Sequence, residues 1–318
     1  MTNQRLSAPP TRLDDAARAG WLYYVAGNTQ DEIAQKMGVS RQTAQRLVAM
    51  AVSERLVKVR LDHPIGRCMD LAAELTGRYG LRLAEVVPSD PTAPELLSGV
   101  ASAAAALLER TLRSAEPRII ALGTGRALKA TVEALSRMDC PQHRIVSRLG
   151  NMMADGQATA YNAVVRMADR VGAPHYPCPL PVLVKDAREL EVLHAQEAVR
   201  HTLALCEQAD LTLVGIGQIG PRAPLLLDGF ISGAEMAGLM AEGAVGEITS
   251  LVFDGAGRVI ENGFNARVAS APLSRAGERP VVAVALGEAK AAAIRAALVG
   301  QLVNGLVTNE ATAERLLA

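Results

Sequence analysis

Between residues 83 and 317 the chain alternates short apolar runs with segments of helical length, and this order restricts the possible folds most strongly. The apolar runs that predict strands cover residues 83–87, 118–122, 144–149, 211–216, 248–253, 280–286 and 302–307. The predicted helices cover residues 68–79, 96–112, 126–137, 158–171, 190–207, 231–241, 289–298 and 309–317. We therefore expect a Rossmann-like parallel α/β sheet with helices on both faces.

Composition supports this fold class. Nearly half of the residues, 49%, are apolar and only 3% are aromatic. Alanine, valine and leucine suit helices packed on a parallel sheet better than an all-β sandwich. A length of 318 residues suggests about two domains.

Residues 29–51, TQDEIAQKMGVSRQTAQRLVAMA, form a separate pattern near the N-terminus. Ile33, Ala34 and Met37 share one helical face, and Gly38 permits a tight turn. Ser40 can cap a second helix, whose inward positions are Ala44, Leu47, Val48 and Ala51. This spacing predicts a helix-turn-helix, whose second helix lies in the DNA major groove.

Neighbouring segments add to that prediction. We expect Trp21, Leu22, Tyr24 and Val25 to lie on a third helix and supply its core contacts. Residues 56–61 alternate apolar and basic side chains, like one strand of a wing. The predicted DNA contacts are Thr29, Ser40, Arg41, Gln42, Thr43, Gln45, Arg46, Lys58 and Arg60.

An ordinary helical hairpin with a basic face is the alternative to a DNA-binding unit. Charge asymmetry favours DNA contact. Residues 1–60 hold nine lysines and arginines against five acids, a net charge of +4, and the remaining residues carry −4.

The four cysteines, Cys68, Cys140, Cys178 and Cys206, are far apart and contain no CxxC pair. Neither a zinc site nor a disulfide framework is expected, and we predict no metal and no cofactor.

The N-terminus lacks an apolar signal segment and the chain has no apolar run of transmembrane length, so we expect a cytoplasmic protein. Residues 1–10 are expected to be a disordered tail, residues 11–62 a DNA-binding domain, and residues 63–318 an effector-binding and oligomerisation domain.

Glycines mark the ends of four predicted strands. In open α/β sheets ligands bind at the carboxyl ends of the strands, where glycine lets backbone N–H groups approach an anion or hydroxyl. The predicted ligand residues at these ends are Gly123, Thr124, Gly125, Arg126, Arg148, Asn151, Gln218 and Lys290. Gln157 and Glu247 can bond sugar hydroxyls. The spacing fits neither the dinucleotide fingerprint nor a P-loop, and the pattern predicts a phosphate or polyhydroxyl site.

Together these segments resemble the SorC/DeoR-type sugar-binding transcriptional regulators of bacteria. The residues that carry the resemblance are those of TQDEIAQKMGVSRQTAQRLVAMA, IIALGTGRALKATVEAL, ADLTLVGIGQIG, GAVGEITSLVFDGAGRVI and the closing VAVALGEAKAAAIRAALVGQLVNGLVTNEATAERLL. The resemblance implies a phosphosugar-isomerase-like effector domain, a sugar, polyol or sugar-phosphate ligand, operator DNA as partner, and self-association as dimers or tetramers.

By position, the resemblance puts the phosphate or equivalent hydroxyls near residues 123–126. It puts sugar contacts near Arg148, Gln157 and Glu247, with Lys290 closing the pocket. Glu288 stands where the family often has a second glycine. A carboxylate beside the lysine would neutralise its charge, which favours an unphosphorylated ligand.

Two other functions are weighed against a ligand-controlled regulator. A sugar-phosphate isomerase or aldolase with an added DNA-binding domain would need an acid/base pair, for which Glu247 and Lys290 are the candidates. Lys290 as a Schiff-base amine would require a lowered pKa, and pairing with a ligand oxygen is the simpler role. An RNA-binding role lacks an aromatic platform.

Overall fold

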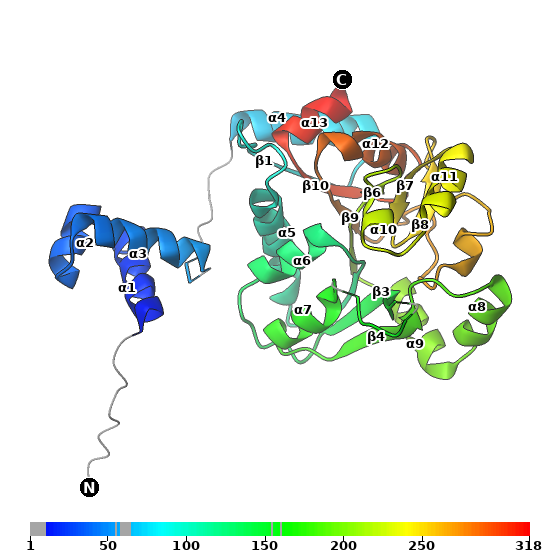
Figure 1. The fold of residues 1–318 in the computed structure, drawn as a ribbon, viewed down its shortest axis with the longest axis horizontal. Helices are drawn as coiled ribbons and strands as arrows, with labels where there is room; N and C mark the ends of the chain where they lie inside the picture. The colour runs from blue at the N-terminus through cyan, green and yellow to red at the C-terminus, as the bar shows by residue number, and fades with distance from the viewer. Residues whose placement is uncertain (1–10, 55, 58–64, 154, 160) are drawn as a thin grey trace, which may run out of the picture. The chain divides into compact units, whose positions relative to one another are not determined.

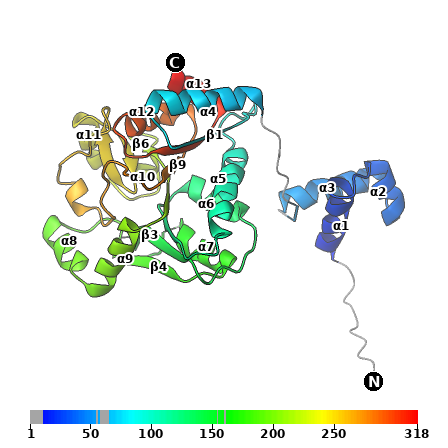
Figure 2. The ribbon, with the colours of Figure 1, turned by 180° about the vertical axis from the view of Figure 1, so that it is seen from behind.

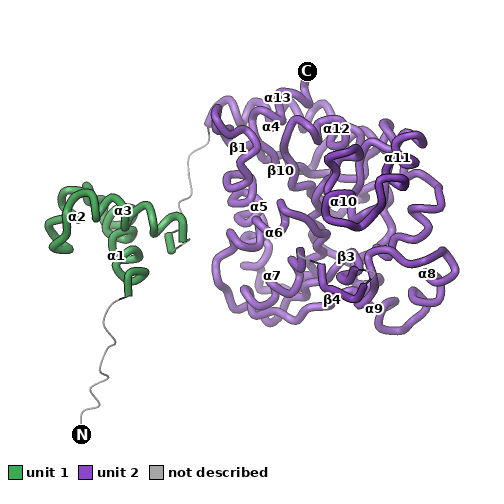
Figure 3. Tube along the Cα trace, in the orientation of Figure 1, with its two compact units in different colours: residues 1–63 green, residues 64–318 purple. Residues whose placement is uncertain are grey.

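The computed structural model describes residues 11–54, 56–57, 65–153, 155–159 and 161–318. The chain divides into two compact units, residues 1–63 and 64–318 (Figure 3). The expected tail at residues 1–10 and most of the expected wing, residues 58–61, lie outside the described residues.

The first unit contains three described helices: α1 (Arg12–Tyr24), α2 (Gln30–Met37) and α3 (Arg41–Ser53). Gly38 ends α2 at φ 66°, a left-handed conformation that glycine adopts without steric cost. Ser40 caps α3 by accepting the N–H of Thr43 at 3.1 Å. The four predicted inward positions of α3 are all buried, which confirms that prediction.

The prediction of which side chains of α1 contribute to the core is wrong. Trp21, Tyr24 and Val25 are 56%, 41% and 67% exposed, and Leu22 is only partly buried. The buried face of α1 instead carries Ala16, Ala19 and Gly20. Small residues let α1 approach α3 closely: a Cβ on Gly20 would meet the side chain of Ala51 at 2.7 Å.

A parallel sheet forms the centre of the second unit, as the strand–helix alternation predicted. Its described strands, in spatial order, are β1 (Leu83–Val87), β10 (Gly305–Asn309), β9 (Val281–Val284), β5 (Leu211–Val214), β2 (Ile119–Leu122), β3 (Arg144–Met152) and β4 (His175–Pro181). Every neighbouring pair in this sheet is parallel.

Helices cover both faces of the sheet (Figures 1 and 2). One face packs on α5 (Leu97–Leu112), α6 (Arg126–Ala134) and α7 (Ala163–Val171). The other packs on α4 (Gly66–Tyr79), α9 (Glu197–Glu207), α12 (Ala291–Val299) and α13 (Glu310–Leu317). Side chains alternate between the faces: Ile120 and Leu122 contact the first layer and Ala121 the second.

A small antiparallel sheet lies beyond the end of β5. Its described strands are β6 (Gly217–Gln218), β7 (Ala244–Ile248) and β8 (Leu251–Asp254). Around it lie α10 (Pro224–Leu227), α11 (Gly233–Ala241) and the 3₁₀ turns η1 (Asn265–Arg267) and η2 (Glu288–Lys290), whereas α8 (Ala187–His194) packs on η1 and α9. The prediction of one strand over residues 248–253 is confirmed only for residues 251–253, which belong to β8. Thr249 and Ser250 form a two-residue turn at φ 51° and 67°, without the usual Asn or Gly signal.

Strand β3 also differs from expectation, because it continues through Gly150 to Met152 rather than ending at a glycine. Gly150 is needed for close strand pairing: a Cβ there would lie 2.4 Å from the carbonyl oxygen of Pro181. The proline-rich segment 174–181 contains edge strand β4, for which no strand was predicted. Edge strands tolerate proline because one of their sides needs no ladder hydrogen bonds.

Two predicted helices also have different bounds. Residues 190–207 form two helices, α8 and α9, instead of one. The helix expected over residues 158–171 begins only at Ala163, after a loop that includes Tyr161.

Candidate functional site

Three adjacent strands of the large sheet, β2, β5 and β9, end beside one pocket. Each is followed by a glycine-containing loop, and these loops include residues 123–125, 215–217 and 286–290. The pocket has a volume of about 230 Å³, enough for one small molecule. Its place at the carboxyl ends of central parallel strands is where open α/β sheets bind ligands.

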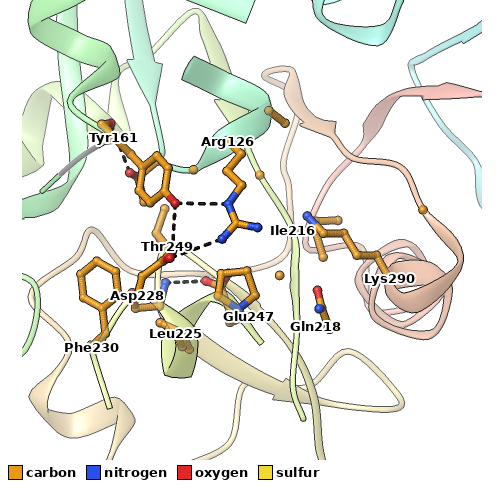
Figure 4. Close-up of a pocket in the computed structure, with 18 of the residues that line it drawn as sticks. Arg126, Tyr161, Ile216, Gln218, Leu225, Asp228, Phe230, Glu247, Thr249 and Lys290 are labelled. Carbon is orange, nitrogen blue, oxygen red and sulfur yellow. Dashed lines mark hydrogen bonds and ion pairs between the residues drawn. The ribbon is translucent and has the colours of Figure 1, made fainter. Parts of the chain in front are cut away.

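The lining combines charged, polar and apolar side chains (Figure 4). Its charged and polar side chains belong to Glu95, Thr124, Arg126, Thr159, Tyr161, Gln218, Arg222, Asp228, Glu247, Thr249, Ser250 and Lys290. Leu149, Val182, Ile216, Leu225, Phe230 and Leu286 supply apolar surface. Such a mixture fits a ligand with hydroxyl groups on a hydrocarbon chain.

Arg126, Tyr161 and Asp228 form a closed hydrogen-bonded network on one wall of the pocket (Figure 4). The Arg126 Nε donates to Tyr161 Oη at 3.2 Å, and its terminal nitrogen lies 3.3 Å from Asp228 Oδ1. Tyr161 Oη donates to Asp228 Oδ2 at 2.9 Å. These contacts hold the pKa of Arg126 above its usual value, so the guanidinium remains charged and is already paired.

Glu247 lies in β7 on another wall of the pocket. Its Oε2 accepts the N–H of Ser250 at 2.8 Å, which supports the tight turn after β7. Gly217, its partner in β6, leaves space for the carboxyl, because a Cβ there would meet Glu247 Oε1. Burial raises the pKa of Glu247, and the hydrogen bond from Ser250 and the charge of Lys290 oppose that rise.

Lys290 closes the 3₁₀ turn η2 at the start of α12. Burial lowers its pKa, while the negative charges of Glu247 and Glu95 raise it. Glu288, expected to neutralise this lysine, instead forms an ion pair with Arg315. The carboxylates that act on Lys290 are therefore different from the one that the sequence suggested.

Gln218 has an unused acceptor in the pocket wall. Its Nε2 donates to the carbonyl oxygen of Arg222 at 3.1 Å, which orients the amide. Its Oε1 is buried and has no hydrogen-bond partner among the described residues. Leaving such an acceptor unpaired is costly, so a ligand that donates a hydrogen bond would be stabilised here.

Six predicted ligand residues line the pocket together: Thr124, Gly125, Arg126, Gln218, Glu247 and Lys290. The other four, Gly123, Arg148, Asn151 and Gln157, are not among its lining residues. Gly123 lies directly before the loop, where a Cβ would crowd Thr249 Cγ2 at 3.1 Å.

These remaining side chains are used differently or face elsewhere. Arg148 donates to the carbonyl oxygen of Pro272 at 2.9 Å, and the side chain of Gln157 is exposed. Asn151 lies within β3, and its carbonyl accepts the N–H of Thr159 at 2.9 Å.

Tyr161 and Asp228 were not predicted as site residues from the sequence. Tyr161 fell inside a predicted helix, and Asp228 lies just after the short helix α10, which no periodic pattern marked. Their contact with Arg126 depends on tertiary structure, since they lie 35 and 102 positions from it in the chain.

The predicted DNA-contacting residues of the first unit lie on one exposed stretch. Ser40, Arg41, Gln42, Thr43, Gln45 and Arg46 are all exposed, as is Thr29 at the start of α2. Thr29 caps α2 with a reciprocal bond to Glu32, and Arg41 forms an exposed ion pair with Asp31 at 3.3 Å. An exposed ion pair is weak, so it leaves Arg41 available to a phosphate or base. Lys58 and Arg60 lie outside the described residues.

No group of three or more histidine, cysteine, aspartate or glutamate side chains among the described residues is arranged to hold a metal ion. Every helix among these residues is too short or too polar to span a lipid bilayer.

Comparison with known proteins places the chain among regulators. Residues 63–318 match the family described as "Putative sugar-binding domain". The chain is 34% identical to the erythritol catabolism regulatory protein EryD of Brucella abortus, over 95% of this chain and 96% of that protein. It is 32% identical to the transcriptional regulator LsrR of Klebsiella pneumoniae, over 95% and 92% of the two chains.

A solved structure shares the fold over nearly the same length. The full-length sorbitol operon regulator SorC of Klebsiella pneumoniae superposes with a TM-score of 0.70 at 25% identity. The match covers 96% of this chain and 99% of that one.

Proposed function

This chain belongs to the SorC/DeoR-type family of sugar-binding transcriptional regulators, and from that membership we propose that it controls a carbohydrate or polyol catabolic operon. Operator DNA is bound by the first unit, and a sugar, polyol or sugar phosphate by the pocket of the second. The observation that carries the proposal is the pocket at the ends of β2, β5 and β9, in a chain similar over 95% of its length to a regulator of erythritol catabolism.

We assign the first unit as a helix-turn-helix, with α3 as the recognition helix. Support comes from the buried face of α3, its Ser40 cap, the left-handed Gly38 before it, and the row of exposed arginine and glutamine side chains. Arg41 and Arg46 are suited to guanine edges or phosphates, and Gln42 and Gln45 to adenine. A palindromic operator needs two such helices, so we propose a dimer or a tetramer.

Control of DNA binding is proposed to follow from linkage. An effector that binds about 100-fold more tightly to the form with low operator affinity weakens operator binding by about 2.7 kcal/mol at saturation. Such an effector is bound and released unchanged. We therefore propose a sensor rather than an enzyme, acting in the cytoplasm where DNA is accessible.

The DNA-binding assignment is tested with the double variant Arg41→Ala/Arg46→Ala. We expect loss of the operator shift in a gel assay, with effector binding to the second unit unchanged. The matched control is Arg188→Ala/Arg200→Ala, which removes the same charge from exposed positions in the second unit. Wild-type operator affinity in the first variant would refute the assignment of α3. Consumption of effector by wild-type protein would favour the isomerase or aldolase alternative.

A further inference from the structure

The charges around the pocket balance one another. Among the described residues that line it, three side chains are basic and three are acidic, so their formal charges cancel: Arg126, Arg222 and Lys290 against Glu95, Asp228 and Glu247. A phosphate ester brings close to two negative charges, which a neutral lining does not compensate.

Arg126 is the cation placed best for an anionic ligand, because it begins α6 directly after the glycine loop. Its guanidinium is held by Tyr161 and by the Asp228 carboxylate at 3.3 Å. A phosphate at this position would have to displace Asp228 or bind beside its negative charge. Both alternatives cost free energy, since like charges in a partly buried site repel strongly.

Lys290 offers no better site for a phosphate. Burial lowers its pKa, which disfavours the charged form, and the negative charges that oppose this shift belong to Glu247 and Glu95, which would repel a phosphate. A dianion bound at Lys290 would also approach the Glu247 carboxylate across the same pocket.

The unpaired groups of the pocket instead fit hydroxyls. Gln218 Oε1 is a buried acceptor with no partner in the part of the chain that the structure describes, and it needs a donor such as a hydroxyl, which the oxygens of an ionised phosphate group cannot supply. The Glu247 carboxylate likewise accepts hydrogen bonds. The start of α6 has no side-chain cap, so its backbone N–H groups can donate to hydroxyl oxygens. A hydroxyl group is both donor and acceptor, and the apolar wall at Leu225 and Phe230 suits a carbon chain.

We propose that the effector is an uncharged polyol rather than its phosphate ester, and that Asp228 sets this selectivity by pairing with Arg126. This inference rests on the proposed sensor function and specifies the ligand class of the same pocket. Asp228 is thus a specificity-determining residue that disfavours phosphate by occupying the cation that would otherwise bind it.

Calorimetric titration of the full chain tests the proposal, with erythritol, xylitol and sorbitol compared with the monophosphate of each. We expect at least one polyol to bind wild-type protein about tenfold or more tightly than its monophosphate. In Asp228→Asn, which frees Arg126, we expect the monophosphate to gain affinity by about tenfold or more. The matched control Glu314→Gln breaks an exposed ion pair with Arg67, outside the pocket, and is expected to leave both affinities unchanged.

A second variant keeps the test informative if Asp228→Asn is unstable. The single variant Arg126→Gln is expected to lower monophosphate affinity only slightly, because the guanidinium it removes is already paired with Asp228. Combined with Asp228→Asn, it is expected to abolish the increase in monophosphate affinity that Asp228→Asn produces alone. Tighter binding of every monophosphate than of its polyol by wild type would overturn the inference and leave the sensor function standing. Binding of neither class, together with operator affinity that no sugar, polyol or phosphate changes, would overturn both.

Discussion

The structural roles of some residues in the first unit can be predicted from local chemistry alone. Ser40 is predicted as a cap because its hydroxyl can accept a backbone N–H, and Gly38 as a turn because it lacks a Cβ; the structure contains both features. Tyr161 and Asp228 could not be predicted in this way. Their role depends on a contact with Arg126 that only the folded chain creates.

At this scale, Lys290→Ala tests the ligand pocket. Loss of the ammonium removes a charged hydrogen-bond donor, so we expect effector affinity to fall by roughly tenfold or more. Operator affinity without effector is expected to stay at the wild-type value. Titration calorimetry measures the first and gel shift the second, with exposed Lys185→Ala as the matched control. An unchanged effector titration would remove Lys290 from the site.

The pH dependence of effector binding tests Glu247. Burial raises the pKa of this carboxyl, so on acidification it takes up a proton at a higher pH than an ordinary glutamate, whose pKa is about 4.3. The ionised form is the better acceptor for ligand hydroxyls. Effector affinity is therefore expected to be full above the raised pKa and to fall as the pH decreases through it. The variant Glu247→Gln cannot titrate at this position, so it is expected to bind the effector more weakly and to show no such pH dependence. If effector affinity of the variant still fell on acidification as in wild type, Glu247 would be excluded as the cause of that fall.

Among elements, the central strands were predicted well because buried parallel strands are continuous apolar runs. Strand β1 has the predicted bounds, and β2, β5 and β9 lie within theirs. The β7–β8 turn was missed because Thr249 and Ser250 adopt positive φ without a glycine or asparagine. Gly150 was wrongly interpreted as the end of a strand. Glycine occurs both where strands end and where two strands approach closely, and only the position of the neighbouring strand shows which applies.

The left-handed conformation of Gly38 in the α2–α3 turn contributes to the stability of the first unit. Gly38→Ala forces a residue with a Cβ into φ 66°, although no neighbour lies within 4 Å, so we expect a backbone cost of about 1 kcal/mol. Trp21, the chain's only tryptophan, lies in α1 and reports on this unit by fluorescence during urea unfolding. Gly77→Ala, inside α4 and equally free of neighbours, is the matched control and is expected to stabilise its helix. An unshifted Trp21 transition in Gly38→Ala would contradict the assigned turn geometry.

An α/β sheet and a domain boundary near residue 62 could be predicted from the sequence, and the structure contains such a sheet and divides into two compact units between residues 63 and 64. A net charge of zero conceals the positive N-terminal segment. The composition of the pocket could not be derived from the chain, because its walls come from loops spread between Glu95 and Lys290. Six lining residues were predicted from the glycine-marked loops and the family resemblance, whereas the others come together only through tertiary packing.

The most direct test of the account is reciprocal linkage between the two units. The binding polyol is titrated calorimetrically into the full chain, alone and saturated with an operator duplex selected from random DNA. The expected result is that operator changes polyol affinity by the same factor by which polyol changes operator affinity, as thermodynamic linkage requires. Identical polyol affinity with and without operator would contradict it, because the pocket would then have no influence on the DNA-binding unit.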